Sequence, residues 1–229
     1  MKIITWNCNL NFSKKFENLE AFDSDIIIIQ ECERLKTDFF PNHNFFWTGR
    51  IESKGLGVMI SKSTKARISD LHNQKLINFL PIETESLNIL GVWAYNHRAA
   101  KFGNDVSGNT SDALSFYKNW LAESEVSIFG GDFNNSVVWD KEEKENNFLS
   151  IKSSLKNLDF RSIYHHKTKE DYGSEKEPTF FHTKKENKSY HIDYIFLKGM
   201  EAKSIDIGLY SDWIELSDHM PLICEIGNY

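Results

Sequence analysis

Cysteine is scarce in this sequence, and the three that occur lack the spacing of a metal site. Cys8, Cys32 and Cys224 each lie in or beside an apolar run. An odd number of cysteines without a paired pattern argues against a disulfide framework. We therefore expect buried thiols in a protein of a reducing compartment.

The sequence also lacks an apolar run of about 18 residues and a stretch with the features of a signal peptide. The first absence argues against a membrane-spanning helix. Met1 leads directly into a segment with the pattern of a strand. We expect a soluble, cytoplasmic monomer without membrane insertion.

An excess of positive charge is missing as well. Lysine and arginine number 27 against 33 acidic residues, which gives a formal net charge of −6 at pH 7. No global basic field draws such a protein onto nucleic acid. Composition therefore argues against tight, sequence-blind DNA binding, whereas a local basic groove is compatible with this balance.

Apolar residues are plentiful, at 40% of 229 residues, and they include 17 phenylalanines and 6 tryptophans. A chain of this length and composition can bury a sizeable core. No repeat, linker or low-complexity segment is evident in the sequence. We expect residues 1–229 to form a single domain.

Several short apolar runs typical of buried strands end abruptly in polar side chains. The clearest run, 126–131, ends in two glycines and is followed by Asp132 and Asn134. Side chains two apart in an extended chain project to the same side, so this carboxylate and this amide share a face. By itself, Gly-Asp-x-Asn more often marks an ordinary turn.

The same pattern recurs along the chain. The other polar strand ends are Asn7 with Asn9, Glu31, Tyr95 to His97, His191 with Asp193, and Asp218 with His219. Each alone is compatible with an ordinary solvated or hydrogen-bonded residue. Sites collect where several strands of a layered α/β fold end at one edge, so we expect these side chains to share one pocket.

Helices are predicted in three segments: residues 12–22, a helix that Ser111 caps, and residues 141–158. The polar residues 165–178 are predicted to form a long loop. Residues 179–197 have the pattern of a hairpin, and its turn carries Lys184, Lys185 and Lys188.

The polar strand ends combine carboxylates, amides, histidines and a tyrosine, without an evident serine or cysteine nucleophile motif. Hard oxygen ligands with few nitrogens and no thiolates favour Mg²⁺ or Mn²⁺ over zinc. Phosphoester hydrolysis needs such an ion on the phosphate oxygens, a base for water, and donors for the transition-state charge.

Five motifs in this order resemble the endonuclease/exonuclease/phosphatase superfamily, which includes exonuclease III-like and DNase I-like enzymes. They are Trp-Asn-x-Asn at 6–9, Gln-Glu at 30–31, Gly-Asp-x-Asn at 131–134, His-Ile-Asp-Tyr at 191–194 and Ser-Asp-His at 217–219. The resemblance implies an α/β fold of four layers, in which two central mixed β-sheets are flanked by helices (DNase I-like).

The resemblance also implies a metal site that holds Mg²⁺ or Mn²⁺. Glu31 is expected to be the main ligand, and Asn7 is expected to assist it. Asn9 and Asp218 are expected to lie near the same ion.

The remaining motif residues are expected to act on the substrate. The resemblance implies that Asp132 orients or deprotonates the attacking water, while Asn134 holds that water or a phosphate oxygen. His219, oriented by Asp193, is expected to hydrogen-bond the phosphoryl oxygen in the transition state. Tyr95 is expected near the leaving group.

Some positions stay open. Asn96 and His97 compete with Tyr95 for the place near the leaving group. His191 stands where many relatives have an arginine, and it either titrates near neutral pH or bonds a neighbouring carboxylate. Three residues lie in the region that lines the sugar pocket of abasic-site enzymes: Phe180, Tyr190 and Ile192. They could line such a pocket here, but we favour the interpretation that they are part of the hairpin core.

The preferred function is a metal-dependent phosphodiester hydrolase, a nuclease acting on DNA by in-line attack of water. A phosphomonoesterase or a lipid or inositol-phosphate esterase is the alternative, because DNA-binding proteins normally carry a basic stripe. A catalytically silent binding module is less favoured, since no residue of the key set Glu31, Asp132, Asp193 and His219 is missing.

Overall fold

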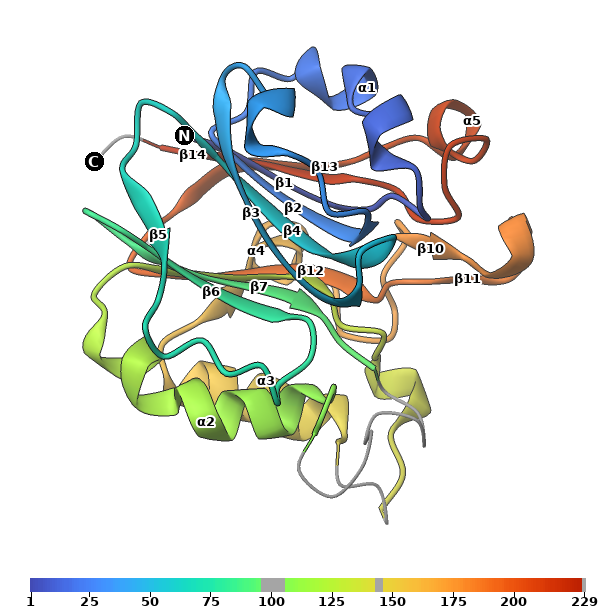
Figure 1. Cartoon of the computed structure of the whole chain (residues 1–229). Coiled ribbons are helices and arrows are strands. Elements are labelled where there is room, and N and C mark those ends of the chain that lie inside the picture. Colours follow the sequence, from blue (N-terminus) through green and yellow to red (C-terminus); the bar gives the residue numbers. More distant parts are fainter. Residues whose placement is uncertain (96–105, 143–145, 228–229) are drawn as a thin grey trace.

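The computed structural model describes residues 1–95, 106–142 and 146–227. Its centre is a pair of six-stranded β-sheets that face each other (Figure 1). In spatial order, the first sheet consists of β13 (Ala202–Ile207), β14 (Leu222–Ile226), β1 (Lys2–Asn7), β2 (Ile26–Cys32), β4 (Lys54–Ser61) and β3 (His43–Ile51). The second consists of β5 (Ala66–Ile68), β6 (Phe79–Thr84), β7 (Asn88–Trp93), β8 (Ser127–Asp132), β12 (Asp193–Lys198) and β9 (Arg161–Ser162).

Helices cover the outer faces of both sheets, so the expected four-layer α/β arrangement is confirmed (Figure 1). The α-helices are α1 (Glu17–Glu20), α2 (Thr110–Glu123), α3 (Phe148–Asn157), α4 (Ile163–Thr168) and α5 (Tyr210–Trp213). Short 3-10 turns occur at η1 (Phe12–Lys14), η2 (Thr37–Phe39), η4 (Val137–Trp139) and η5 (His182–Lys184). A separate small hairpin pairs β10 (Phe180–Phe181) with β11 (Ser189–Tyr190).

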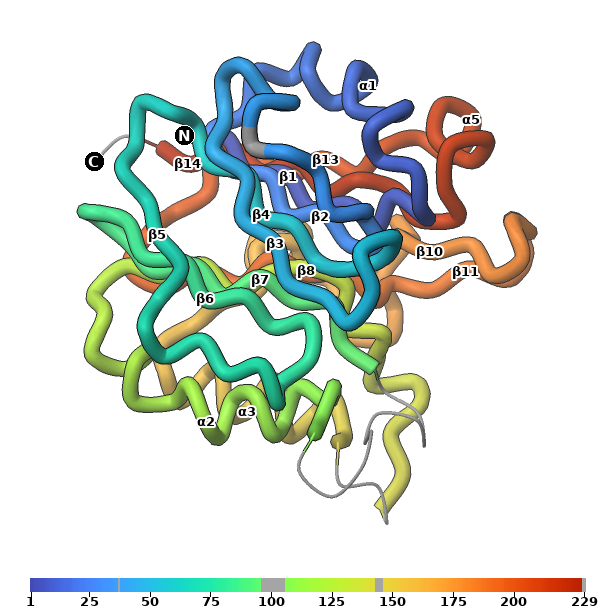
Figure 2. Tube along the Cα trace, viewed as in Figure 1, coloured from blue at the N-terminus to red at the C-terminus, as the bar shows by residue number. Residues whose placement is uncertain are grey.

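Each large sheet is mixed, with a parallel pair at its centre. β1 runs parallel to β2 in the first sheet, and β7 runs parallel to β8 in the second. The carboxyl ends of paired parallel strands lie at one edge of their sheet, which gathers the polar residues that follow them. On the side of β1 away from β2, β14 pairs antiparallel with β1. This pairing brings the two ends of the described chain side by side (Figure 2).

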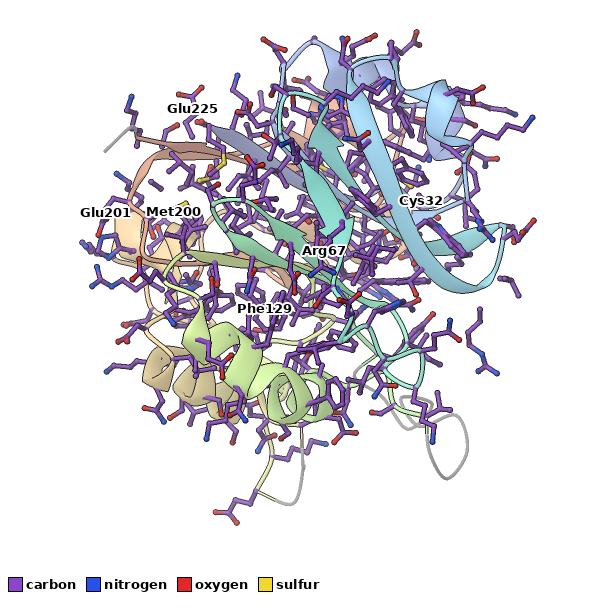
Figure 3. All side chains as sticks on the ribbon, turned by 60° about the vertical axis from the view of Figure 1, so that its left-hand side comes forward. Cys32, Arg67, Phe129, Met200, Glu201 and Glu225 are labelled. Atoms are coloured by element: carbon purple, nitrogen blue, oxygen red, sulfur yellow. The ribbon has the colours of Figure 1, made fainter. Side chains whose placement is uncertain are left out.

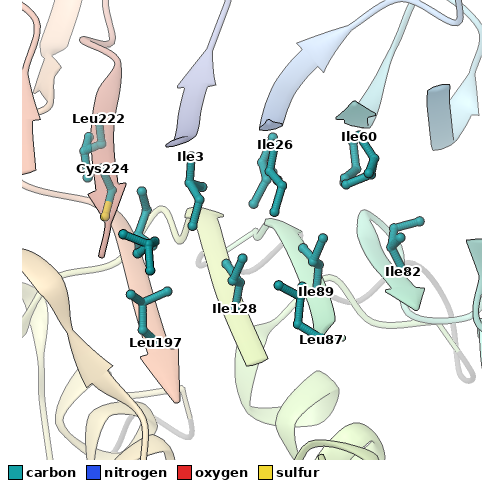
Figure 4. Close-up of a cluster of buried hydrophobic side chains, with 14 of the residues drawn as sticks. Ile3, Ile26, Ile60, Ile82, Leu87, Ile89, Ile128, Leu197, Leu222 and Cys224 are labelled. Carbon is teal, nitrogen blue, oxygen red and sulfur yellow. The ribbon is translucent and has the colours of Figure 1, made fainter. Parts of the chain in front are cut away.

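The isoleucine run of β2 explains why both faces of the first sheet are covered. Ile26 and Ile28 point into the core between the sheets, whereas Ile27 and Ile29 point into the core beneath η1, α1 and α5. Facing residues such as Ile89 come from the second sheet (Figure 4). Each fully buried isoleucine contributes about 1.5–3 kcal/mol of hydrophobic stabilisation.

The outer core of the second sheet is aromatic. Phe129, at 0% exposure, lies between its strand and the helices, while Glu201 and Glu225 lie at the periphery of the molecule (Figure 3). Phe133 packs edge-to-face on Phe148 of α3 with ring centroids 6.2 Å apart. In the described ranges, no helix is long and apolar enough to span a bilayer.

The three cysteines are buried free thiols, as expected. Burial raises the pKa of each thiol above its ordinary value. The thiolate is the reactive form, so these side chains are chemically inert parts of the core.

The predicted starts of two helices, α2 and α3, are wrong, because each helix is capped by a side chain that lies before the predicted start. Asn109, not Ser111, caps α2: its side chain accepts the Asp112 backbone N–H at 2.8 Å. In the segment predicted as a helix from 141, α3 spans Phe148–Asn157, and the described residues 141–142 and 146–147 are not helical. There the Asp140 carboxylate accepts the Phe148 N–H at 2.7 Å, which caps the helix from the preceding turn.

Two further expectations need correction. The predicted helix over 12–22 is split into η1 and α1, because the first turn closes with a 3-10 hydrogen bond, from the Lys15 N–H to the Phe12 carbonyl at 2.8 Å. The predicted loop over 165–178 begins inside α4, which buries Ile163 and Tyr164 and ends at the left-handed Lys169.

Candidate active site

The carboxyl ends of β1 and β8 meet where the two sheets come together. Asn7 Nδ2 donates a hydrogen bond to Asp132 Oδ2 at 3.0 Å, and both residues are buried. Gly131 within β8 has φ +144° and lets the strand approach β7 closely, because a Cβ there would lie 1.9 Å from the Val92 carbonyl oxygen. Directly after β8, the chain turns back on Asp132: the Asn134 backbone N–H donates to Asp132 Oδ1 at 2.8 Å.

Asn134 and Asn7 bind the same carboxylate oxygen. Asn134 Nδ2 lies 3.0 Å from Asp132 Oδ2 and 2.9 Å from the Ala94 carbonyl oxygen. Among the described residues, the hydrogen bonds that Asp132 accepts come from amide groups, and each of these bonds favours its charged form.

Asp193 lies directly opposite Asp132 in the register of β12 and β8. Its Oδ2 accepts from Thr179 Oγ1 at 2.7 Å and from His219 Nδ1 at 2.9 Å. Within the part of the chain that the structure describes, Asp193 Oδ1 is buried without a hydrogen-bond partner. A buried carboxylate oxygen without a donor is a site for a cation or a proton.

The loop that carries His219 is fixed to β1. Ser217 Oγ donates to the Asn7 carbonyl at 2.7 Å and accepts the His219 backbone N–H at 3.0 Å. Trp6 Nε1 donates to the His219 carbonyl at 2.9 Å. The Phe180 ring lies 4.6 Å from the His219 ring and covers one side of it.

The two charged groups at the centre shift each other's titration. Burial raises the pKa of Asp132 to about 7, and repulsion from Asp193 acts in the same direction. Burial acts to lower the pKa of His219, but attraction from Asp193 and Asp132 outweighs it and raises that pKa to about 9. Near neutral pH, His219 is therefore a cation and Asp132 is poised between its two forms.

The centre fits a metal ion. Asp132, Asp193 and His219 each offer one ligand atom, and these atoms lie within 4.8 Å of one another. The unpartnered Oδ1 of Asp193 adds a second reason for the fit. Oxygen-rich donor sets of this kind suit Mg²⁺ and Mn²⁺.

Glu31 stands near the end of β2, directly after Gln30, which pairs with Asn7 in the parallel register of β1 and β2. It has a partner that no sequence pattern indicates. Its backbone is left-handed, with φ 60°, at a register shift between β2 and β4. Lys54 Nζ, at the start of β4, lies 2.9 Å from Glu31 Oε2 and 5.1 Å from the centroid of the Trp93 ring. Only the strand register places this lysine opposite Glu31, because the two residues are far apart in sequence.

Asn9 and Asp218 form a second hydrogen-bonded pair. Asn9 Nδ2 donates to Asp218 Oδ1 at 3.1 Å, and the Asn9 backbone N–H donates to Asn7 Oδ1 at 3.1 Å. Lys15 ties the two loops together: its Nζ lies 2.6 Å from the carbonyl oxygens of Cys8 and Leu216. No sequence pattern indicated this role for Lys15, which lies in the segment predicted as a helix.

Tyr95 follows β7 and is half-buried, with its ring 5.2 Å from Trp93. Burial raises the pKa of its hydroxyl, which hydrogen-bonds the Asn78 side chain. Its two rivals for the place near the leaving group, Asn96 and His97, lie outside the described residues.

Neither expectation for His191 is correct. Its Nδ1 donates to the Glu177 backbone carbonyl at 2.9 Å, so its acceptor is not a carboxylate. Burial lowers its pKa, which keeps the ring neutral near pH 7, and the ring packs 4.6 Å from that of Tyr164. His191 is therefore part of the core.

The other hairpin residues divide between core and site. Ile192 is buried core, as preferred. Phe180 and Tyr190 are only half-buried, and their rings stack at 6.5 Å. Phe180 also forms part of the site wall, because its ring lies against that of His219.

The chain belongs to the Endonuclease/Exonuclease/phosphatase family, whose model matches residues 4–219. A search among curated proteins found no significant match.

Solved structures share the whole fold at low sequence identity. A 3′-5′ exonuclease (NExo) from Neisseria meningitidis is 18% identical, with 100% of both chains covered and a TM-score of 0.70. An AP endonuclease from Archaeoglobus fulgidus is 14% identical, with 100% of both chains covered and a TM-score of 0.69. D. rerio TDP2 in complex with a single-strand DNA product is 15% identical, with a TM-score of 0.62 over 100% of this chain and 99% of that chain.

Proposed function

We propose that this protein is a divalent-metal-dependent phosphodiester hydrolase, and that it is a nuclease acting on DNA. Its family is one of phosphoester hydrolases. The observation that carries the proposal is the buried network in which Asn7 and Asn134 bind Asp132 while Asp193 binds His219. DNA is supported as substrate by similar structures that hold a product DNA hairpin or a single-strand DNA product.

The side chains divide the reaction between them. Asp132 accepts the proton of the attacking water, and Asn7 and Asn134 fix the carboxylate in position. Attack is in line with the leaving group, beside which we place Tyr95. His219, held as a cation by Asp193, donates a hydrogen bond to the phosphoryl oxygen as negative charge develops there.

We propose Mg²⁺ or Mn²⁺ as the cofactor, which when bound neutralises phosphate oxygens. Glu31 is the proposed main ligand, with Asn7, Asn9 and Asp218 around it. Asp193 Oδ1, which is buried without a hydrogen-bond partner among the described residues, is a further oxygen donor for the same kind of ion. We further propose that residues 1–229 form one domain and act as a cytoplasmic monomer.

The function is tested by an activity panel of abasic duplex, blunt duplex, single-stranded DNA, RNA and a chromogenic phosphodiester. We expect Mg²⁺ or Mn²⁺ to support cleavage of at least one DNA substrate and the chromogenic ester, and excess EDTA to abolish it. Full turnover in EDTA would contradict metal dependence. Cleavage of a small phosphomonoester assayed beside this panel, with every nucleic acid left intact, would instead support the phosphomonoesterase alternative.

Replacing Lys54 with methionine is expected to tighten Mn²⁺ binding about tenfold, which corresponds to roughly 1.4 kcal/mol. The reason is that the Lys54 ammonium competes with the ion for Glu31 Oε2, which lies 2.9 Å away. Calorimetric titration of each variant with Mn²⁺ measures the effect without any turnover.

The matched control for this experiment is Lys65→Met, which removes an exposed lysine paired with Glu85 at 3.1 Å. Its Mn²⁺ affinity should equal that of the unmodified protein. An unchanged affinity in Lys54→Met would argue that Glu31 is not a metal ligand.

A further inference from the structure

The β10–β11 hairpin is attached directly to the catalytic centre. Phe180 forms a β-bridge with His219, and the Phe181 backbone N–H donates to the Asp218 carbonyl at 2.8 Å. Thr179, which precedes the hairpin, binds Asp193. The tip of the hairpin, residues 182–188, projects away from the body of the molecule (Figure 1).

The charge of this tip is opposite to that of the protein as a whole. Three exposed lysines, Lys184, Lys185 and Lys188, stand there with a single acid, Glu186, in a chain of net charge −6. Among the described residues, none of these three lysines forms an ion pair, whereas lysines elsewhere, such as Lys65, do. Unpaired lysines gathered beside a site attract an anionic ligand.

The hairpin is held in a fixed orientation by α5. Tyr210 Oη donates to the Lys184 carbonyl at 2.9 Å, and the Tyr210 ring packs 4.6 Å from that of Phe181. Lys184 Nζ donates to the Glu215 carbonyl at 3.2 Å. Preorganised charges bind a ligand at a lower entropic cost than charges on a loose loop.

We propose that the β10–β11 hairpin binds backbone phosphates of a polynucleotide on one side of the bond that is cleaved. Lys184 is four residues from Phe180, so its Cα lies within about 14 Å of the site wall. That span corresponds to roughly four nucleotides of a stacked strand at about 3.4 Å each. A small phosphate ester in the centre carries no further phosphates for these lysines to bind, whereas a strand carries one at each nucleotide.

This assignment rests on the proposed function. It predicts that the hairpin lysines matter for a long substrate and not for a small one. The test variant is Lys184→Gln/Lys185→Gln/Lys188→Gln. Its matched control, Lys118→Gln/Lys156→Gln/Lys203→Gln, removes the same charge from exposed positions on α2, α3 and β13. Thermal unfolding of both variants verifies that the hairpin change leaves the fold intact.

The first measurement is binding of a labelled single-stranded oligonucleotide by fluorescence anisotropy, in an Asp132→Asn background that slows cleavage. We expect the slope of log affinity against log salt to become shallower by about 2 in the hairpin variant, since each phosphate contact on a single strand contributes about 0.7. The control variant should keep the original slope. Lysine-to-arginine changes at the same three positions should restore it.

The second measurement is kcat/KM for the oligonucleotide and for a chromogenic phosphodiester. The hairpin variant should lose activity only on the oligonucleotide. Equal slopes in both variants, or equal losses on both substrates, would overturn the assignment. The assignment would also be overturned if the hairpin variant lost binding to phosphatidylserine vesicles while its oligonucleotide binding stayed unchanged. Absence of cleavage by the unmodified protein would reject the proposed function, while the binding slopes would still test the hairpin.

Discussion

Replacement of Asp132 with asparagine should reduce kcat/KM on a phosphodiester by about 10²–10⁴-fold, the usual contribution of a general base. The substitution keeps the shape of the side chain and removes its ability to take a proton. It also turns an amide NH₂ group toward a site whose partners, Asn7 Nδ2 and Asn134 Nδ2, are both donors. An unmatched donor in a buried site adds a stability cost of about 1–3 kcal/mol.

The pH dependence follows from the two shifted groups. Asp132 must be deprotonated to accept a proton, so kcat/KM should rise with pH through about 7. His219 must be protonated to donate to the phosphoryl oxygen, so kcat/KM should fall as pH rises through about 9. The resulting bell-shaped profile reports the free enzyme. The residual activity of Asp132→Asn should lack the rising arm.

Asp140→Asn is the matched control, because Asp140 accepts the Phe148 N–H at 2.7 Å, outside the catalytic network. It should lower the melting temperature and leave kcat/KM close to that of the unmodified protein. Full activity of Asp132→Asn with an unchanged pH profile would show that another group acts as the base.

Loss of the His219–Asp193 pair is expected to have the second largest effect. His219→Gln removes the cation that faces the developing phosphoryl charge, and one preorganised donor of this kind contributes about 10²–10³ in rate. Asp193 acts through His219 as a positioning residue, so Asp193→Asn should cost a similar factor. The double variant should be little worse than either single variant, because residues that act as a unit are non-additive.

The pH profile distinguishes positioning from mere structural support. Attraction from Asp193 is one cause of the raised pKa of His219. Asp193→Asn should therefore move the falling arm of the kcat/KM profile to lower pH, an effect that a purely structural role would not produce. Strictly additive losses in the double variant would contradict the coupling that the 2.9 Å hydrogen bond implies.

Local patterning gave the strands, because burial on both faces and a polar end are properties of consecutive residues. The isoleucine run of β2 and the Gly-Gly-Asp sequence of β8 are examples, and both are strands in the structure. Helix starts were less predictable. The carboxylate that caps α3 comes from Asp140, eight residues before the first helical amide.

Partners of the site residues could not be predicted, since they depend on strand register and loop docking. Lys54 reaches Glu31 only because β4 pairs antiparallel with β2, and Lys15 holds two loops that lie about two hundred positions apart in sequence. His191 lies in one of the five sequence motifs, two residues before Asp193, and so was a candidate site residue. Its ring points instead into an aromatic cluster that contains Tyr164.

The sequence by itself determined which strands end in carboxylates, amides and histidines, and the order of those motifs indicated the family. Such features survive in linear sequence because side-chain chemistry and two-residue periodicity are local. The tertiary structure alone decided which of these groups share protons and charge. Asp132 and Asp193 meet through the register of β8 and β12 within one sheet, and His219 joins them only because the two sheets pack face to face.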